Sequence, residues 1–397
     1  MNQNTDITIT KEFEISPFLI MIMSIACAAS AANLYYAQPL LEEISRYFNV
    51  SSSIIGSAAM LIQIGYAIGL IFLVPLGDVK ERRGLIMTML FCSALALIAI
   101  SISSNIWLLL FTSMLVGLTS ITPMLIVPLA AHLAKPAERG KVIGSVMSGL
   151  LIGILLSRVF SGIIGSILGW QIVYRIAAGM MVLLILVFRL WLPKSVPNSS
   201  MSYKKLLKSL IGLLKNQPVL IEASLIGAMM FGTFSIFWTT LSFLLKSPAY
   251  NLGAQAAGMF GLAGIVGALA ASIVGRVADK KSPRFTLTIA IMISLLSYIC
   301  LLIFGHEMWG LIIGVILLDL GIQSAQISNQ ALINTLDATA RSRNNAVYMT
   351  FYFFGGALGS WLGTFFWGLF GWIGVCGIGI TFQIIAATIH IWGVKRR

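Results

Sequence analysis

The chain contains twelve stretches of about 20 mostly apolar residues, spread over its whole length, and this feature limits the possible fold more than any other. An α-helix rises about 1.5 Å per residue, so such a stretch can cross the ~30 Å hydrocarbon core of a bilayer. Because lipid offers the backbone no hydrogen-bond partners and the apolar runs are continuous, they favour helices over a β-barrel. The sequence predicts an all-α integral membrane protein with helices at residues 17–38, 53–76, 85–104, 107–133, 141–165, 169–192, 219–244, 254–277, 285–305, 309–334, 344–367 and 371–393.

Composition supports this class and excludes others. Hydrophobic residues make up 58% of the chain and charged residues 10%, and a soluble domain could not cover so much apolar surface. The formal net charge of +13 is spread over short loops, so we expect no nucleic-acid partner. The four cysteines lie in apolar runs without metal-ligand spacing, which indicates packing residues and no metal site.

The sequence repeats itself with an offset of about half its length. Arg139 precedes Trp170 by 31 residues, and Arg341 precedes Trp372 by the same distance. This pattern predicts two related halves with six transmembrane helices each, a pseudo-symmetric pair of six-helix bundles.

The predicted boundaries follow from changes in composition. We expect a cytoplasmic N-terminal tail at residues 1–16, an N-terminal half at 17–192, a linker at 193–218 and a C-terminal half with a short basic tail at 219–397. Within the linker, apolar residues fall on one helical face and lysines are available to the other, which favours a helix lying on the lipid surface. A flexible linker is the alternative.

The distribution of basic residues predicts the orientation. With the N-terminus inside, 22 of the 26 Lys and Arg fall on one side of the membrane. Basic loops are retained in the cytoplasm during insertion, so we expect a multi-pass protein of the cytoplasmic (inner) membrane with both termini cytoplasmic.

Two short loops carry a shared motif. Residues 74–84 read VPLGDVKERRG, and their counterpart in the second half, residues 275–284, reads GRVADKKSPR. Both resemble the loop signature of the major facilitator superfamily. The resemblance implies that superfamily's twelve-helix fold, with gating-loop residues at Asp78, Arg82, Arg83, Asp279 and Arg284. It also implies that Asp78 latches the two halves together when the cavity opens outward; topology determination is the alternative role for the two arginines.

The fifth predicted helix resembles the antiporter signature of the drug:proton efflux branch, with Ser157-Arg158 in place of Gly-Pro and Ser161-Gly162 in place of Gly-Gly. Small residues at this spacing allow helices to approach closely, which suits a rocking contact between halves. Generic helix packing is the alternative, and it explains the glycines but not Arg158. The antiporter-like residues are Gly144, Gly153, Ser157, Ser161 and Gly162.

Two charged residues lie inside predicted helices, where charge is expensive. An arginine at a helix centre costs at least ~2.5–3.5 kcal/mol on insertion scales, so Arg158 should face protein or water. Asp319 lies near the middle of the tenth helix and is the best candidate for a proton carrier. We expect Asp319 to exchange between a proton and a partner such as Arg158; snorkelling of Arg158 and a fixed structural role for Asp319 are the alternatives.

Polar and aromatic residues at mid-membrane depth are the candidate substrate contacts. Aromatic rings with amide side chains would suit an uncharged or amphipathic organic molecule, such as a drug, nucleoside or sugar derivative. Ordinary hydrogen bonds between helices account for some of these residues. The candidates are Asn33, Tyr36, Gln63, Trp238, Gln323, Gln326, Tyr348 and Tyr352.

The sequence argues against an enzyme. The three histidines are scattered, and neither a catalytic triad, a metal-ligand motif nor an ATP-binding loop of the GxxxxGK[ST] type is found. We therefore expect a secondary transporter without a cofactor, driven by a proton gradient, that exports a small organic substrate as a monomer in lipid. A proton-coupled importer and a transporter-like membrane sensor without turnover are the alternatives.

Overall fold

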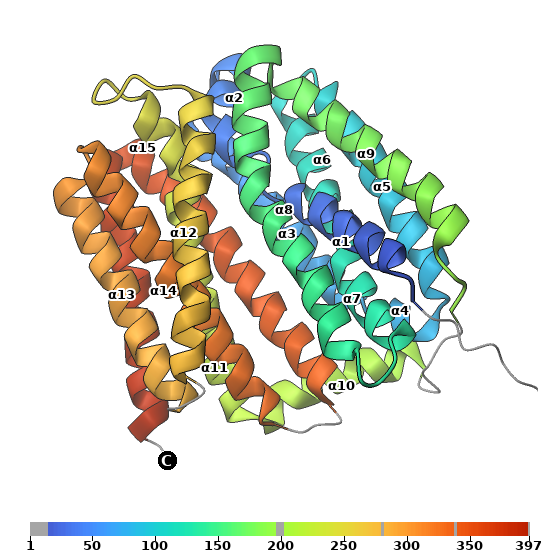
Figure 1. Cartoon of the computed structure of the whole chain (residues 1–397). Helices are drawn as coiled ribbons and strands as arrows, with labels where there is room; N and C mark the ends of the chain where they lie inside the picture. The colour runs from blue at the N-terminus through green and yellow to red at the C-terminus, as the bar shows by residue number, and fades with distance from the viewer. Residues whose placement is uncertain (1–14, 196–201, 279–281, 337–339, 396–397) are drawn as a thin grey trace, which may run out of the picture.

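The computed structural model of the chain describes residues 15–195, 202–278, 282–336 and 340–395, and every regular element in these ranges is a helix (Figure 1). The predicted all-α class is confirmed. The elements are α1 Pro17–Ala32, η1 Gln38–Leu40, α2 Leu41–Phe48, α3 Ser52–Phe72, α4 Leu76–Val79, α5 Arg82–Ser101, α6 Ile106–Thr119, α7 Thr122–Leu133, α8 Arg139–Leu168, α9 Trp170–Trp191, α10 Tyr203–Asn216, α11 Pro218–Lys246, α12 Ala254–Ala278, α13 Pro283–Phe304, α14 Met308–Asn334 and α15 Arg341–Lys395.

The helices are consistent with twelve membrane crossings. Within the described residues, nine spans are long and apolar enough to cross a bilayer, and α1 and residues 254–267 are shorter apolar helices. One of the nine joins α6 and α7, whose shared crossing is interrupted at Ser120 and Ile121. α15 has 55 residues, about 80 Å at ~1.5 Å each, which is enough for two crossings.

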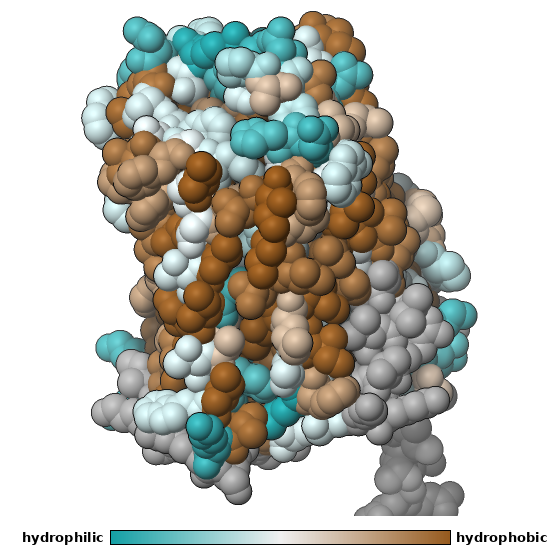
Figure 2. Space-filling model, turned by 90° about the vertical axis from the view of Figure 1, so that its left-hand side faces the viewer, coloured by the Kyte–Doolittle hydropathy of each residue, from teal (hydrophilic) through white to brown (hydrophobic). Residues whose placement is uncertain are grey.

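The outer surface of the bundle is apolar. Figure 2 shows one lateral face on which hydrophobic side chains cover the middle and hydrophilic side chains gather at the end near α2. Large exposed side chains include Phe91, Leu95 and Trp107, the last with 75% of its surface accessible. Such a surface is stable only against lipid hydrocarbon.

Two glycines reverse the chain at equivalent places in the repeat. Gly169 separates α8 from α9 with φ 86° and ψ 153°, and Gly371 interrupts α15 with φ 59° and ψ −144°. Each is followed by one of the tryptophans that revealed the repeat, Trp170 and Trp372. Residues with a Cβ atom rarely adopt these backbone angles. Glycine does so at little cost, and it therefore allows the chain to reverse between two helices without a loop.

Two helix pairs join the N-terminal half to the C-terminal half: α3 packs against α15, and α8 packs against α12 (Figure 1). In the α3–α15 contact, Gln63 Nε2 donates a hydrogen bond to Ser360 Oγ at 2.9 Å. In the α8–α12 contact, a Cβ placed on Gly162 would lie 2.8 Å from Gly258 Cα. The halves therefore meet through small side chains and a buried polar contact.

The linker helix α10 lies across one end of the bundle, here called the linker end (Figure 1). It packs against α11 and α15, and the Tyr203 hydroxyl donates a hydrogen bond to the Phe72 carbonyl at the end of α3. Leu206 is buried, whereas Lys204 and Lys208 are exposed. The amphipathic helix predicted in the linker is thus present, and its contact with lipid remains a prediction.

Replacing Gly371 by alanine should destabilise the protein through its backbone alone. Nothing lies within 4 Å of a Cβ at this position, so the expected loss of about 1–3 kcal/mol comes from the strained φ and not from a clash. The measurement is the thermal unfolding midpoint of the detergent-purified protein. Gly377→Ala, an equally open site in a helix, is the matched control and should be neutral or slightly stabilising. Equal midpoints for the two variants would contradict the assignment.

Candidate functional site

A cavity of about 390 Å³ lies between the two halves and is here called the central cavity. Its lining extends from Tyr35 and Phe234 in the middle of the bundle to Asn334 and Ser342, where α14 ends and α15 begins. These last residues lie at the linker end, so the cavity faces that end. Among the residues that the structure describes, the lining includes no Asp, Glu, Lys, Arg or His.

The two halves give the central cavity different walls. The N-terminal half contributes aliphatic, methionine and proline side chains from α3, α7 and α8, among them Met124, Met147 and Leu150. Among its described residues, Tyr35 and Tyr66 carry the hydroxyl groups of this wall. This surface can bind an apolar ligand face through burial and dispersion.

The wall from the C-terminal half carries the amides, here called the amide row. Gln323, Gln326, Gln330 and Asn334 lie at positions i, i+3, i+7 and i+11 of α14, and this spacing places them on one helical face. Asn345 adds a further amide from α15. The Tyr352 hydroxyl donates to Gln326 Oε1 at 3.3 Å, which orients that amide.

Aromatic rings close the inner end of the central cavity. Phe231 stacks on Tyr352 with 4.1 Å between ring centroids, and Tyr66 lies 4.3 Å from Phe353. Phe234 stacks on Phe231 as well, with 5.5 Å between the two ring centroids. Such a cluster offers flat surfaces on which a ring can stack.

Arg158 lies behind these rings and is 1% exposed. Its guanidinium carbon is 4.8 Å from the centroid of Tyr35, 5.3 Å from Phe234 and 4.2 Å from Trp238. Its Nε donates to Gln38 Oε1 at 2.8 Å, whereas Nη2 has no hydrogen-bond partner. The predicted exclusion of this side chain from lipid therefore holds, with π faces and one amide stabilising the charge.

Asp319 lies in the opposite half and is 2% exposed. Its Oδ2 has no hydrogen-bond partner and borders Gly264 of α12, where a Cβ would lie 3.0 Å from Oδ2 and 3.3 Å from Trp238 Cζ2. Asp319 and Arg158 form no salt bridge within 4 Å, but their charges interact. The structure thus brings the two predicted charges together across the interface between the halves.

One face of α12 contacts the helices that carry both charges. A Cβ on Gly258 would lie 2.5 Å from the Arg158 carbonyl oxygen, and one on Gly267 would lie 2.9 Å from Asp319 Cβ. Gly261 and Gly264 complete a glycine at every third position. The sequence interpretation missed this stripe, although the three-residue spacing was a usable signal.

The other predicted substrate contacts divide into two groups. Gln323, Gln326 and Tyr352 line the central cavity. The rest lie outside its lining, with partners as follows: Asn33 donates to Ser93 and Ser120, Gln63 donates to Ser360, Tyr36 packs on Phe160, Trp238 packs on Arg158, and Tyr348 packs on Gly227. Their role toward substrate stays a prediction. Gln330, Asn334 and Asn345 line the cavity and were not predicted.

The antiporter-like residues of α8 have different environments. Gly144 has nothing near its Cβ position, Gly153 packs on the backbone of Ala28 in α1, and Gly162 packs on α12. Ser157 and Ser161 are buried, and their hydroxyls bond to carbonyls of their own helix. The motif therefore serves contacts with two helices, one in each half.

The first gating loop is held within the N-terminal half. Arg82 donates to Asp78 Oδ1 at 3.0 Å and to the Gly77 carbonyl at 2.9 Å, and Arg83 donates to the Arg189 carbonyl at 2.6 Å. Both arginines thus make hydrogen bonds within the N-terminal half, in addition to any effect of their charge on topology. A latch by Asp78 in an outward-open state stays a prediction.

Glu81 stands where the family loop has a glycine, and it begins α5. Its carboxylate accepts hydrogen bonds from the backbone N–H groups of Arg83, Gly84 and Ser195. Partial burial raises its pKa, but these three bonds and the Arg83 charge outweigh burial and hold the pKa of Glu81 below its ordinary value.

The second gating loop is described only in part. Asp279 lies outside the described residues. Arg284 donates to Glu222 Oε2 at 3.0 Å and to the Gly393 carbonyl at 3.0 Å, which ties α13 to α11 and to the end of α15. Arg83 and Arg284 therefore bind the last turns of corresponding helices in the two halves.

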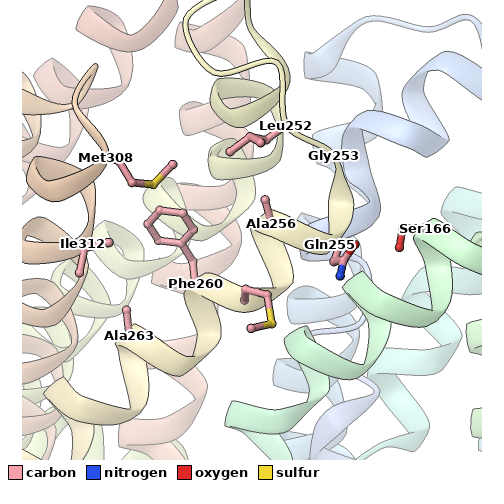
Figure 3. Close-up of a pocket in the computed structure, with 10 residues that line it drawn as sticks. Ser166, Leu252, Gly253, Gln255, Ala256, Phe260, Ala263, Met308 and Ile312 are labelled. Atoms are coloured by element: carbon pink, nitrogen blue, oxygen red, sulfur yellow. The ribbon is translucent and has the colours of Figure 1, made fainter.

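A second cavity, of about 570 Å³, lies between α12 and the start of α14, beside the last turns of α8 (Figure 3). Phe260, Met308 and Ile312 line it, and Gln255 and Ser166 are its polar side chains. Met308, the first residue of α14, is 39% exposed. The central cavity has more polar side chains in its lining, and its Tyr35 and Phe234 rings contact the buried Arg158, so the central cavity is the candidate functional site. No group of three or more possible metal ligands occurs among the described residues.

Gly153→Ala should be destabilising, whereas Gly144→Ala on the same helix should not. A Cβ on Gly153 would overlap the backbone of Ala28, so α1 and α8 must separate, at a cost of about 1–3 kcal/mol. Thermal unfolding of the two purified variants checks this. A Gly153→Ala protein as stable as its Gly144→Ala control would show that α1 and α8 are not closely packed there.

Glu81→Gln should reduce stability at neutral pH and lose this effect in acid. The folded-state pKa of Glu81 is depressed, so its stabilisation is present above its ordinary pKa of 4.5 and disappears as the pH falls through the lower folded value. Roughly 0.3–1 kcal/mol is expected, since the group is largely solvated. Unfolding midpoints at pH 7 and at a series of pH values falling below 4.5 measure it. Glu138→Gln, at an N-cap without a side-chain bond, is the control, and a pH-independent Glu81→Gln effect would contradict the prediction.

Comparison with known proteins identifies the family. The model of the Major Facilitator Superfamily matches residues 21–360. The transporter YgaY of Escherichia coli O157:H7 is 41% identical over 385 residues, 97% of this chain and 98% of YgaY. Two solved structures have TM-scores of 0.75: the nucleoside transporter NupG, 15% identical over 94% of this chain and 98% of NupG, and an inward-facing bacterial homologue of the lysosomal transporter Spinster, 14% identical over 94% and 95%. At such identity, these structures show the fold alone. The chain belongs to the major facilitator superfamily and is a membrane transporter rather than an enzyme.

Proposed function

We propose that the protein exports a small uncharged organic compound in exchange for protons, by alternating access of the central cavity. The observation that carries this proposal is the placement of Arg158 and Asp319, which are both buried, lie in different halves and keep unpartnered polar atoms behind the cavity. A fixed structural ion pair would be expected to satisfy those atoms.

The proton step follows from the surroundings of Asp319. An apolar environment favours the protonated acid, and a nearby positive charge favours the carboxylate. If the two halves rock, the distance between Arg158 and Asp319 changes, because each belongs to a different half. Asp319 then takes up a proton when Arg158 withdraws and releases it when Arg158 approaches. No cofactor is needed, since the proton gradient supplies the energy.

The contacts between the halves suit such a motion. The α8–α12 contact consists of glycine against backbone, so it has few interlocking side chains to hinder sliding. The Gln63 to Ser360 hydrogen bond is one that must break when the halves separate along α3 and α15. Small residues at a moving interface are also what the antiporter-like spacing predicts.

The orientation in the membrane completes the proposal. The linker end, toward which the central cavity faces, carries the basic loops, and we assign it to the cytoplasm of a bacterial inner membrane. Both termini are then cytoplasmic, the exposed lysines of α10 face lipid headgroups, and a monomer contains the complete cavity.

Asp319→Asn should abolish exchange of substrate for protons. Inverted membrane vesicles are acidified inside, and a panel of drugs, nucleosides and sugar derivatives is tested for dissipation of the pH gradient. A compound that dissipates it with the wild type should act no faster on Asp319→Asn vesicles than on vesicles without the protein, because an amide cannot carry the proton. Glu307→Gln, a neutralised acid at the start of the same helix, is the matched control and should behave as wild type.

The other outcomes identify the alternatives. Undiminished exchange by Asp319→Asn would remove Asp319 from the mechanism. Uptake into right-side-out vesicles driven by an inward proton gradient would identify an importer. Ligand binding without flux in either direction would identify a sensor.

A further inference from the structure

The two walls of the central cavity point to the chemistry of its substrate. We infer that the transported compound is an uncharged ring compound with an apolar face and one hydrogen-bonding edge, bound with that edge against the amide row of α14. Uncharged nucleosides and aryl glycosides belong to this class. The inference rests on the proposed function only in treating the central cavity as the substrate site.

The described part of the lining carries no charged side chain, which disfavours ionic substrates. An ion that enters the cavity gives up water, and the described lining offers it no counter-charge. Arg158 cannot serve as one, because it is 1% exposed and lies on the far side of the Tyr35 and Phe234 rings. A phosphate or carboxylate on the substrate should therefore weaken binding strongly.

The polar groups on the C-terminal wall are available to a ligand. Gln323, Gln330 and Asn345 make no side-chain hydrogen bond among the described residues, and all three line the cavity. Gln326 accepts from Tyr352 through its Oε1, so its Nε2 group stays free to donate. Four amides on one helical face, each with an NH2 donor and a carbonyl acceptor, match a row of hydroxyl or amide groups along a ligand edge.

The facing wall and the inner end select the rest of the molecule. Apart from the Tyr35 and Tyr66 hydroxyls, the described side chains of this wall offer no strong hydrogen bond, so a second polar edge on the ligand would lose its water with little compensation. At the inner end, Phe231 and Tyr352 stack within 15° of parallel, which presents a flat platform for a ring. A sugar without an aromatic ring could bond to the amide row but would have no ring to stack at the inner end.

Binding to detergent-purified protein, without any gradient, tests the inference. The probes are uncharged nucleosides and aryl glycosides, each compared with its phosphate ester and with the sugar alone, and dissociation constants come from calorimetric titration. At least one probe should bind, with its phosphate ester and its sugar each at least tenfold weaker. The inference is overturned if no probe binds, or if a phosphate ester binds as tightly as its parent.

Two variants locate the hydrogen-bonding edge. Gln323→Leu and Gln330→Leu should each weaken a bound probe about two- to tenfold, the loss of one uncharged hydrogen bond. Gln171→Leu, the same change on α9 outside both cavities, should leave binding unchanged. A probe that lacks its hydroxyls should be indifferent to the amide changes, which separates a lost contact from a disturbed fold. Unchanged affinity in both variants would overturn the assignment of the amide row.

This experiment and the gradient experiment fail independently. A probe that binds as expected but never dissipates a pH gradient would refute proton antiport and leave the substrate class standing. A charged compound that dissipates the gradient through Asp319 would refute the substrate class and leave proton antiport standing.

Discussion

The energetic problem on which the rest of the structure depends is a guanidinium ion buried in the middle of a membrane protein. Insertion scales assign an arginine at a helix centre a cost of at least ~2.5–3.5 kcal/mol. Here that cost is offset by three aromatic faces and one amide, because Arg158 lies over Tyr35, Phe234 and Trp238 and donates to Gln38. One of the three rings belongs to the N-terminal half and two belong to the C-terminal half. The environment of the Arg158 charge therefore depends on the relative position of the two halves.

Two of the aromatic rings that contact Arg158 also face the central cavity. Tyr35 and Phe234 contact Arg158 and also line the central cavity. The charge and the cavity are therefore separated by the thickness of a ring. Asp319 is placed on the other side of this arrangement by α12, whose glycines contact both α8 and α14. The cavity, the arginine and the aspartate form one connected region.

Much of the architecture could be predicted from the sequence, since helix length, apolar runs and the repeated spacing of Arg and Trp follow directly from chain chemistry. The burial of Arg158 and Asp319 away from lipid was also predictable, because a charge inside a membrane helix is costly unless protein or water surrounds it. The partners of buried amides were not. Asn33 and Gln63 are polar residues in apolar helices, and only the fold shows that they bond to neighbouring helices.

Other features were missed for identifiable reasons. Gln330 and Asn334 lie nearer the linker end than the mid-membrane zone in which substrate contacts were sought, although they continue the spacing of Gln323 and Gln326. Glu81 does not match the loop signature, so its role was not recognised from the sequence. Its carboxylate caps the start of α5 and also accepts a hydrogen bond from the backbone of Ser195. In both cases the local pattern was visible, but its function depended on elements distant in sequence.

The linker helix has a mechanical consequence. α10 packs on α11 and α15 of the C-terminal half, yet its Tyr203 bonds to Phe72 of the N-terminal half. If the halves rotate at this end, as the proposed function requires, the hydrogen bond from Tyr203 to Phe72 breaks while the packing of α10 on α11 and α15 can persist. One such bond contributes about 1 kcal/mol, which biases the ratio of the two conformations roughly fivefold. If the halves rock as proposed, α10 therefore favours the conformation in which Tyr203 and Phe72 are bonded, and it does so from outside the central cavity.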